Sequence, residues 1–507
     1  MKKPNFLVIV ADDMGFSDAG CYGGEISTPN LDKLGYNGVR FTQHYSTGRC
    51  WPSRATLLTG QYYQQVPKHS ADGPLPNWGR TIPHYLKPEG YRCYHSGKWH
   101  VNQVPTITDH GGFDRSYHVR DYDRNFAVSD HRLDDNPLPP ADQASGYYSS
   151  TAIAQYGIDF LNEHEQSHTE SPFFMYLAFI APHFPLHAPE EDIEHYRGQY
   201  DCGWDEIRQQ RIRRMQELGI VNCDLSPRQP NVKPPWNFSP EALKEEIGEG
   251  EAPRALAWRS LTEEQKKLQA KKMEVHAAMV HRMDREIGRV LDKLDEMGEL
   301  EDTVVMFVSD NGASAEQIIR GDGHDKTAKP GSEETYLCLG PGWSTASNTP
   351  FRYHKSWVHE GGVASPLIVN WPNGINASGE LRKAPGHFVD ILPTMLEIAG
   401  ADASPDWRGK NVPSPAGVSL EPALHEDVDI SREAIFFSHI GHRGLRIGNW
   451  KLVAVKYGQW ELYDMKNDRS ELHNLAKEHP AKVQEMAKLW KQYQTKFAEQ
   501  SGENRIK

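Results

Sequence analysis

The chain has 507 residues and a formal net charge of −13, from 69 acidic and 56 basic side chains. Its hydrophobic content of 38% and charged content of 25% are typical of a soluble globular protein, neither disordered nor fibrous. The acidic balance argues against a nucleic-acid partner, because no basic excess is present to meet a phosphate backbone. No apolar run is long enough to span a bilayer, so no membrane partner is expected.

The first residues, "MKKPNFLVIVADD", imitate the start of a signal peptide. The apolar run covers only residues 6–11, ends in two aspartates and has no small-residue cleavage site after it. We therefore interpret it as a buried strand. The expected location is cytoplasmic for the sequence as it stands, and periplasmic or secreted if an export signal has been removed.

Short apolar runs followed by helical patterns continue along the first four hundred residues. The clearest helix is expected at residues 263–298, where Val280, Met283 and Ile287 follow a 3.6-residue period. Further strands are expected at residues 173–180, 304–309 and 366–371. This alternation predicts an α/β fold with a large, mixed, mostly parallel sheet sandwiched by helices. Ligands of such sheets bind beyond the carboxyl ends of the strands.

The composition changes near residue 401, where a polar, Pro- and Gly-rich stretch continues to about residue 432 and suggests a linker. Beyond it, "AIFFSHI", "GLRIGNWKLVAVK" and "WELYDM" alternate like antiparallel strands, and a closing helix is expected at 480–499. The sequence therefore predicts two domains. These are an α/β domain at residues 1–400 and a small C-terminal α+β domain with an antiparallel sheet at residues 401–507.

The stretch "GRCWPSRATLLTG" at residues 48–60 places a thiol at a predicted helix N-terminus. Pro52 suits the first helical position and Gly60 the C-terminal stop. Cys50 would then lie where free backbone N–H groups and the helix dipole attract an anion, with Arg54 one turn along. The other five cysteines lie far apart in the sequence, so a disulfide scaffold is not expected, although a single bridge is left open.

Two predicted strands end in oxygen-bearing side chains. Residues 6–11 are followed by Asp12 and Asp13, and residues 304–309 by Asp310 and Asn311. Each pair alone is typical of turn and capping residues. Both pairs at the ends of buried strands favour a site for Ca²⁺ or Mg²⁺, whereas Zn²⁺ would more often bring His or Cys ligands.

Two motifs connect these residues to a known family. "CWPSRATLLTG" resembles the first sulfatase signature, C-x-P-S-R-x-x-x-L-T-G, and "GYRCYHSGKWH" at residues 90–100 resembles the second. The second has one departure, since Cys93 stands where the pattern expects Ser or Thr. The similarity runs from "PNFLVIVADDMGFSDAGCYGGEISTPNLD" to "WELYDMKNDRSELHNLA", nearly the whole chain. The chain is most similar to bacterial arylsulfatases of the alkaline phosphatase-like superfamily.

The resemblance implies that Cys50 is oxidised to Cα-formylglycine by a maturation enzyme. The hydrated aldehyde would attack the sulfur of a sulfate ester, form a sulfated enzyme intermediate and then expel sulfate by collapse to the aldehyde. The substrate would be a small-molecule or carbohydrate sulfate ester. The metal, Ca²⁺ with Mg²⁺ as the alternative, would be held by Asp12, Asp13, Asp310, Asn311 and the oxygen at position 50.

The resemblance also implies roles for five further side chains. Arg54 would hold the formylglycine hydroxyl, and Lys98 and Lys355 would bind the sulfuryl oxygens. His100 would be the base that triggers elimination, and His183 would protonate the leaving alcohol, with help from Lys355. Lys355 comes from "TPFRYHKSWVHEGG" and His183 from "APHFPLHAP", which are looser motifs.

Two other functions are compatible with the same residues. One is a phosphonate monoester or phosphodiester hydrolase of the same superfamily, which would use the same site. The other is a non-catalytic, metal-dependent protein that binds sulfated glycans with Cys50 unmodified. The leaving group is not encoded in any motif, because the segments expected to shape its pocket, 102–150 and 197–262, contain no recognisable ligand pattern.

Overall fold

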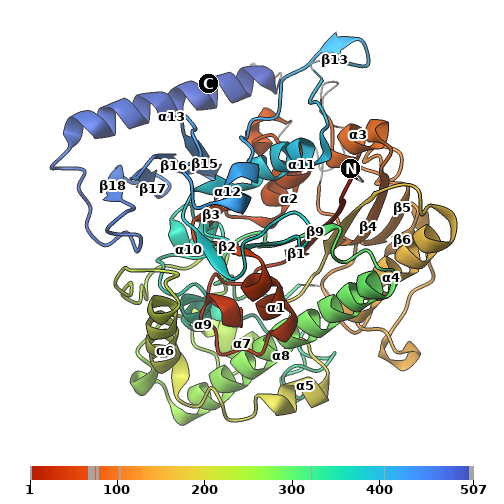
Figure 1. Cartoon of the computed structure of the whole chain (residues 1–507). Coiled ribbons are helices and arrows are strands. Elements are labelled where there is room, and N and C mark those ends of the chain that lie inside the picture. Colours follow the sequence, from red (N-terminus) through yellow and green to blue (C-terminus); the bar gives the residue numbers. More distant parts are fainter. Residues whose placement is uncertain are drawn as a thin grey trace.

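A computed structural model describes residues 3–66, 75, 79–101, 104–320, 323–404 and 406–501. The centre of this described part is a single ten-stranded sheet (Figure 1). Its strands, in spatial order, are β11 (Glu380–Arg382), β2 (Val39–Phe41), β10 (Leu367–Asn370), β9 (Thr303–Ser309), β1 (Asn5–Ala11), β8 (Phe173–Ala178), β4 (Arg92–Lys98), β5 (Arg115–Val119), β6 (His131–Leu133) and β7 (Asn136–Pro137).

The five strands from β9 to β5 are parallel to one another. At one side β10 runs antiparallel to both β9 and β2, and at the other β6 and β7 continue the sheet as an antiparallel ribbon. The expected mixed, mostly parallel sheet is therefore confirmed. The apolar run at 366–371 does form a strand, but its direction is opposite to that of its neighbour β9.

Strand β1 is buried on both faces, as its continuous apolar run indicates. Leu7 and Ile9 face one core, to which seven helices contribute. These are α1 (Pro29–Asn37), α4 (Ser149–Ser167), α5 (Glu190–His195), α6 (Gly203–Glu217), α7 (Pro240–Glu246), α8 (Glu263–Glu296) and α9 (Gly340–Ser347). Phe6, Val8 and Val10 face the other core, formed with α2 (Cys50–Thr59), α3 (Ile82–Leu86), α11 (Ile391–Ala399) and α12 (Glu421–His425).

The C-terminal part contains a separate antiparallel sheet of four strands, in the order β15 (Ile435–His439), β16 (His442–Ile447), β17 (Trp450–Ala454) and β18 (Glu461–Asp464). Helix α13 (Pro480–Gln500) lies along it and buries Met486 and Phe497 against β15, β16 and β17 (Figure 1). The expected sheet and closing helix are both present. The segment expected as a linker contains α12 and the strand pair β13 (Asp406–Trp407) and β14 (Lys410–Asn411). Where one domain ends and the next begins stays a prediction.

A buried ionic cluster joins this sheet to the rest of the chain, and we call it the interface cluster. It consists of Glu360, Lys451, Arg469 and Glu471. Lys451 Nζ lies 2.7 Å from Glu360 Oε1 and 2.8 Å from Glu471 Oε1. Glu360 Oε2 is 3.3 Å from Arg469 Nε and accepts a hydrogen bond of 3.1 Å from Tyr45 OH. Glu360 begins the short helix α10 (Glu360–Val363), and Tyr45 belongs to β3 (His44–Tyr45), which pairs with β12 (Gly386–His387).

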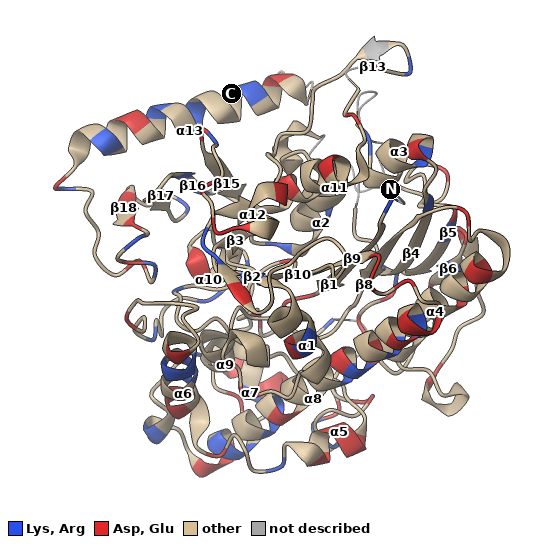
Figure 2. Cartoon of the chain, viewed as in Figure 1, with Lys and Arg blue, Asp and Glu red and all other residues tan. Residues whose placement is uncertain are grey.

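All six cysteines belong to the described residues, and each is a free thiol. Among those residues, no helix combines the length and the apolar character that crossing a bilayer requires. Acidic and basic residues both occur along the ribbons of α8 and α13 (Figure 2). The net negative charge is therefore not gathered on these two helices.

Candidate active site

The two metal pairs expected from the sequence lie side by side. Strands β1 and β9 are parallel neighbours with Ala11 opposite Ser309, so the residues that follow them leave the sheet together. Asn311 Nδ2 donates to Asp13 Oδ1 at 2.7 Å, and the Asp13 backbone N–H donates to Asp310 Oδ1 at 3.3 Å. Asp12, Asp13, Asp310 and Asn311 are all buried.

Cys50 is the first residue of α2, whose N-terminus points into this group of carboxylates. The helix therefore begins two residues earlier than expected. Pro52 occupies the third helical position, where its missing N–H still costs no intrahelical hydrogen bond. Gly60 ends the helix with a positive φ of 63° as expected. Cys50 is 3% exposed, and burial raises the pKa of its thiol even though Lys98 and Lys355 oppose the shift. The thiol is thus protonated at neutral pH.

Arg54 connects helix α2 to the ends of the strands. Its Nε donates to Asp310 Oδ2 at 2.8 Å, its Nη1 donates to the Lys98 carbonyl at 3.0 Å, and its Nη2 lies 3.6 Å from Asp12 Oδ2. Burial and the charge of Asp12 nevertheless raise the pKa of Asp310 to about 7, which Arg54 only partly offsets. At Asp310, burial and the neighbouring carboxylate therefore outweigh the charge of Arg54.

Lys98 ends β4 and its ammonium group contacts Asp12 Oδ2. Burial alone would raise the pKa of Asp12, but Lys98 and the other nearby cations hold it well below its usual range. The preceding Gly97 has a φ of 117°, and a Cβ atom there would lie 2.0 Å from the Ala178 carbonyl oxygen. Only glycine therefore permits the approach of β4 to β8 that positions Lys98. The strands expected from the sequence did not include β4, which lies inside the sheet.

His100 follows in a left-handed conformation with a φ of 49°, and Asp13 has a φ of 68°. Such backbone strain is concentrated at functional sites. His100 Nε2 lies 3.4 Å from the hydroxyl of Tyr122, and its Nδ1 is buried without a hydrogen-bond partner. Burial and the charge of Lys98 lower the pKa of His100 well below its usual value. The imidazole is therefore neutral and able to accept a proton.

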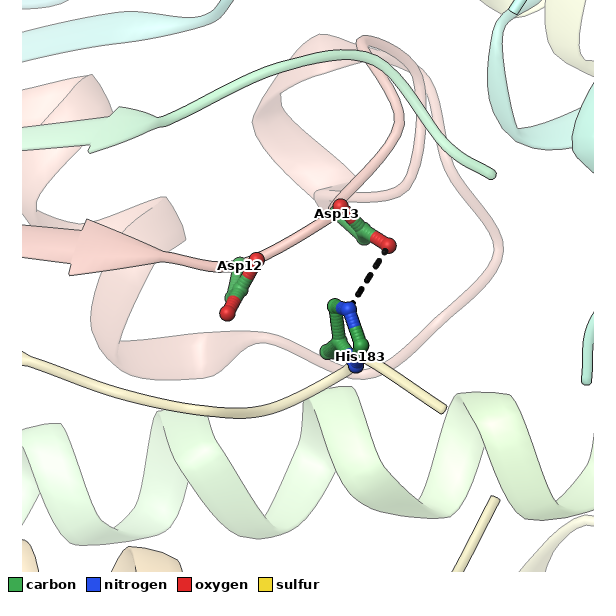
Figure 3. Close-up of side chains that lie close together, drawn as sticks. All are labelled: Asp12, Asp13 and His183. Atoms are coloured by element: carbon green, nitrogen blue, oxygen red, sulfur yellow. Dashed lines mark ion pairs between the residues drawn. The ribbon is translucent and has the colours of Figure 1, made fainter. Parts of the chain in front are cut away.

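His183 and Lys355 complete the surroundings of Asp13. Lys355 Nζ lies 2.8 Å from the Asp13 carboxylate and 3.5 Å from Glu316 Oε2. His183 Nε2 lies 3.7 Å from Asp13 Oδ2, and its Nδ1 donates to the Phe184 carbonyl at 2.5 Å (Figure 3). Burial and the charge of Lys355 lower the pKa of His183, so the neutral ring presents an unprotonated Nε2 toward Asp13. All residues expected at the site are thus brought together, while their roles stay predictions.

The donor atoms fit a hard divalent cation. Asp12 Oδ1 and Asn311 Oδ1 are buried and have no hydrogen-bond partner, which a bound cation would supply. Asp12, Asp13 and His183 each offer a ligand atom within 4.8 Å of one another (Figure 3). Carboxylate and amide oxygens dominate this set, as Ca²⁺ and Mg²⁺ require. His183, expected as an acid, also lies within reach of the metal position.

Comparisons with known proteins agree with this geometry. Residues 4–401 match the sulfatase family model, and residues 351–500 match the model for the C-terminal part of N-sulphoglucosamine sulphohydrolase. An uncharacterized sulfatase of Schizosaccharomyces pombe is 34% identical over 97% of this chain and 94% of its own length. The arylsulfatase of Klebsiella aerogenes is 32% identical over 83% of this chain and 91% of its own length. The chain belongs to the sulfatase family.

Solved structures show the same fold for this sulfatase at lower sequence identity. One, in complex with its substrate D-glucosamine-2-N,6-O-disulfate, has a TM-score of 0.66 at 21% identity, covering 99% of this chain and 100% of its own. The phosphonate monoester hydrolase of Silicibacter pomeroyi has a TM-score of 0.61 at 19% identity, covering 97% and 96%. The expected superfamily and the enzyme class, a sulfuric ester hydrolase, are confirmed at the level of the family.

Sequence reasoning missed two side chains of the sulfatase's active site. Glu316 is buried between Lys355 and Arg49, with its Oε1 3.8 Å from Arg49 Nη2. Tyr122 places its ring 4.1 Å from Lys98 Nζ and its hydroxyl against His100. Neither residue belongs to a sequence motif. Both lie in loops, and the positions of these loops depend on tertiary packing rather than on a local sequence pattern.

Proposed function

We propose that this sulfatase hydrolyses sulfate esters at residue 50 after Cys50 has been oxidised to Cα-formylglycine. The observation that carries the proposal is the position of Cys50. It begins α2 among Lys98, Lys355, Asp12 and Asp310, whose charges act on it, yet burial keeps its thiol protonated. A protonated thiol is a poor nucleophile, and a thiolate that attacked sulfur would keep the sulfuryl group with no internal means of releasing it.

An aldehyde at this position removes both difficulties. Oxidation by the maturation enzyme, which uses its own oxidant, removes the sulfur and replaces the CH₂–SH group with CHO, and addition of water gives a geminal diol. One hydroxyl attacks the ester sulfur while the S–O bond to the leaving alcohol breaks. The second hydroxyl then loses its proton, its oxygen forms the C=O bond, and sulfate leaves with the electrons of the C–O bond. The aldehyde is regenerated and only water is consumed.

Asp12, Asp13, Asp310, Asn311 and the oxygen at position 50 would hold the divalent cation, Ca²⁺ with Mg²⁺ as the alternative. When bound, this ion polarises a sulfate oxygen and lowers the pKa of the attacking hydroxyl. The partnerless oxygens of Asp12 and Asn311 support this assignment. The pKa of Asp310, raised by burial and then by the charge of Asp12, supports it as well.

The cations of the site bind and orient the substrate. Arg54 is fully buried and fixed by Asp310, so it holds the hydroxyl at position 50 in one orientation. Lys98 and Lys355 keep their charge, because Asp12 and Asp13 outweigh the effect of burial and raise the pKa of each lysine. Both ammonium groups can therefore stabilise the negative charge that develops on the sulfuryl oxygens.

Two histidines would move the protons. His100 is neutral and carries a buried, partnerless Nδ1, which suits the base that takes the proton of the second hydroxyl. His183 would protonate the leaving alcohol. Because burial and Lys355 lower its pKa, the ring holds a second proton only weakly. Lys355, which stays protonated and is directed to the same carboxylate, shares this role.

The substrate class is a sulfate ester of a carbohydrate or of a small aromatic alcohol. A carbohydrate sulfate is supported by the structural neighbour whose bound substrate is D-glucosamine-2-N,6-O-disulfate. An aryl sulfate is supported by the similarity to the Klebsiella aerogenes arylsulfatase. A formylglycine-generating maturation enzyme would be the obligatory partner in either case.

The test is to produce the protein together with a formylglycine-generating enzyme and to digest it with trypsin. The peptide of residues 50–54, "CWPSR", should carry the mass change for conversion of CH₂SH to CHO. The enzyme should turn over 4-nitrophenyl sulfate faster than 4-nitrophenyl phosphate and phenyl phosphonate. Cys50→Ala should lower kcat/KM for the sulfate by at least about 10⁴-fold.

Cys93→Ser is the matched control, because it changes another buried cysteine to a residue that the second signature expects. It should keep kcat/KM within about threefold, as surface or conservative changes away from the chemistry do. Equal activity of Cys50→Ala and the parent enzyme would contradict the proposal. A clear preference for phosphorus esters would assign the chain to phosphonate or phosphodiester hydrolysis instead.

A further inference from the structure

Two cavities open beside residue 50 and share a wall. The nearer one, of about 360 Å³, is lined by the neighbours of Cys50 in sequence, Arg49 and Trp51, and by Trp236, Arg320 and Ile440. The farther one, of about 800 Å³, also includes Trp51 and Ile440, and extends to Tyr457. The two cavities therefore adjoin at Trp51, His439 and Ile440, and we call them together the groove, which extends from beside the active site across the C-terminal sheet.

The groove has exposed aromatic and apolar walls. Of the described residues, four large apolar side chains are exposed, and three of them border this groove. These are Trp236, Ile440 and Tyr457, which are 38%, 45% and 92% exposed. Trp51 adds an indole that meets the ring of Tyr63 edge to face at 5.3 Å. A concentration of exposed apolar side chains along one groove marks a binding surface.

The groove is also positively charged, in a chain whose net charge is −13. Arg49, Arg320, Arg443 and Lys456 line it, and the one carboxylate among its lining residues is Glu316. Glu316 already faces Lys355 in the active site. Within the described part of the chain, the contacts of Arg443 and Lys456 are with the rings of Trp460 and Tyr457 and the Gly458 carbonyl, and no ion pair with a carboxylate is formed by either.

The far half of the groove is built by two turns of the C-terminal sheet. Ile440 lies in the turn between β15 and β16 with a φ of 42°, and Tyr457 follows β17 with a φ of 63°. The ammonium group of Lys456 lies 5.1 Å from the Tyr457 ring. The positive φ of Ile440 is what the two-residue turn between His439 and His442 requires. The exposure of Ile440 and Tyr457 on these turns is what favours a role in recognition.

From this arrangement we infer that the groove binds a sulfated oligosaccharide, of which one sulfate reaches residue 50. The apolar faces of sugar rings pack on Trp51, Trp236 and Tyr457, while sulfates farther along the chain meet Arg443 and Lys456. A small aryl sulfate would fill the nearer cavity alone. The inference rests on the proposed function for the choice of ligand, and it assigns the C-terminal sheet to substrate specificity.

The experiment separates the groove from the chemistry. Binding is measured by calorimetry on the Cys50→Ala protein, which cannot turn over its ligand, with sulfated tetrasaccharides and disaccharides prepared from heparin and from carrageenan. At least one tetrasaccharide should bind about tenfold more tightly than the disaccharide of its own repeat. Adding Lys456→Ala and Tyr457→Ala together should remove that advantage, because both side chains are exposed and line only the far half.

The matched control replaces the same pair of residue types outside the groove, in Lys33→Ala with Tyr36→Ala, and should leave tetrasaccharide affinity unchanged. In the matured enzyme, the groove variant should keep kcat/KM for 4-nitrophenyl sulfate within about twofold, since the ester fills only the nearer cavity. It should raise KM for the tetrasaccharide without changing kcat.

Equal affinity for disaccharides and tetrasaccharides, or a groove variant with unchanged tetrasaccharide affinity, would overturn the inference while leaving sulfatase activity intact. Tighter binding of a polyglutamate peptide or an oligonucleotide than of any tetrasaccharide would overturn it as well. If the matured enzyme turned over no sulfate ester but still bound tetrasaccharides more tightly than disaccharides, the proposed function would be contradicted. The inference that the groove binds sulfated oligosaccharides would then still stand.

Discussion

Two buried ionic clusters of this sulfatase have the same formal charge balance but differ in the kind of atom left without a hydrogen-bond partner. In the interface cluster two carboxylates face two cations, and both oxygens of Glu360 have a partner. Its partnerless atoms are one donor, Arg469 Nη2, and one acceptor, Glu471 Oε1, which is still ion-paired with Lys451. The active-site cluster comprises three carboxylates and three cations, namely Asp12, Asp13, Asp310, Arg54, Lys98 and Lys355. There the partnerless atoms are two acceptors, Asp12 Oδ1 and the neighbouring Asn311 Oδ1.

The titration of the carboxylates reflects this difference. Burial would raise the pKa of Glu360, but Lys451 and Arg469 outweigh it and lower that pKa. At Asp310 of the active site burial prevails and raises the pKa to about 7, whereas Lys98 and the other cations hold the pKa of Asp12 well below its usual range. Equal numbers of charges are therefore no guide to the purpose of a buried cluster. The distribution of partners distinguishes a cluster that fixes the structure from one that is prepared to receive a ligand.

Removal of the central lysine of the interface cluster should have the largest effect on stability. Lys451→Met would leave Glu360 and Glu471 buried without their ammonium partner, which costs about 3–5 kcal/mol of unfolding free energy. Thermal and urea unfolding would measure this loss. The folded fraction should keep kcat/KM for 4-nitrophenyl sulfate within about threefold. A loss of turnover larger than the loss of folded protein would show that this cluster also serves catalysis.

The same substitution at the active site should act mainly on turnover. Lys98→Met removes a fully buried ammonium group that contacts Asp12 and binds the sulfuryl oxygens in the proposed mechanism, and it should lower kcat/KM by about 10²–10³-fold. Steady-state kinetics of the matured enzyme would measure it. Saturating Ca²⁺ should restore the stability of Lys98→Met but not that of Lys451→Met. Turnover within about threefold of the parent enzyme would remove Lys98 from the proposed mechanism.

Metal withdrawal should affect only the active-site cluster. Dialysis against a chelator should abolish turnover and lower the melting temperature, and Ca²⁺ at about 100 times its Kd should restore about 2.7 kcal/mol. Scanning calorimetry with Ca²⁺ and Mg²⁺ in parallel would identify the ion. Asp13→Asn should weaken this response, whereas Lys451→Met should retain it. A melting temperature that responds to neither ion would contradict the metal assignment.

The active-site geometry could be predicted wherever a residue follows a strongly apolar strand. Asp12 and Asp310 each come directly after such a run, and parallel strands bring their carboxyl ends to one edge. The prediction was wrong about Pro52, because the hydrogen-bonding pattern of α2 begins at Cys50 rather than at the proline. Whether each residue acts as assigned stays a prediction.

Other features of the fold and of the groove could not be predicted from the sequence. Strand β4 contains Arg92, His95 and Lys98 and has no apolar run. It is buried because it pairs with β8 inside the sheet, so its own composition does not reveal it as a strand. The direction of β10 depends on its path through the chain and not on its side chains. The groove joins Trp51, Ile440 and Tyr457 from three separate segments, so no local pattern could have revealed it. The domain limit at residue 400 likewise stays a prediction.

The position of α2 in the sequence has a consequence for the order of events during synthesis. This helix emerges early from the ribosome, but it packs against α11 and the turn at Phe388–Asp390, which emerge far later. At cellular elongation rates the delay is on the order of tens of seconds. The thiol of Cys50 is 3% exposed in the folded chain, and these late segments contribute to its enclosure. The time available for the proposed conversion would thus be set by translation itself.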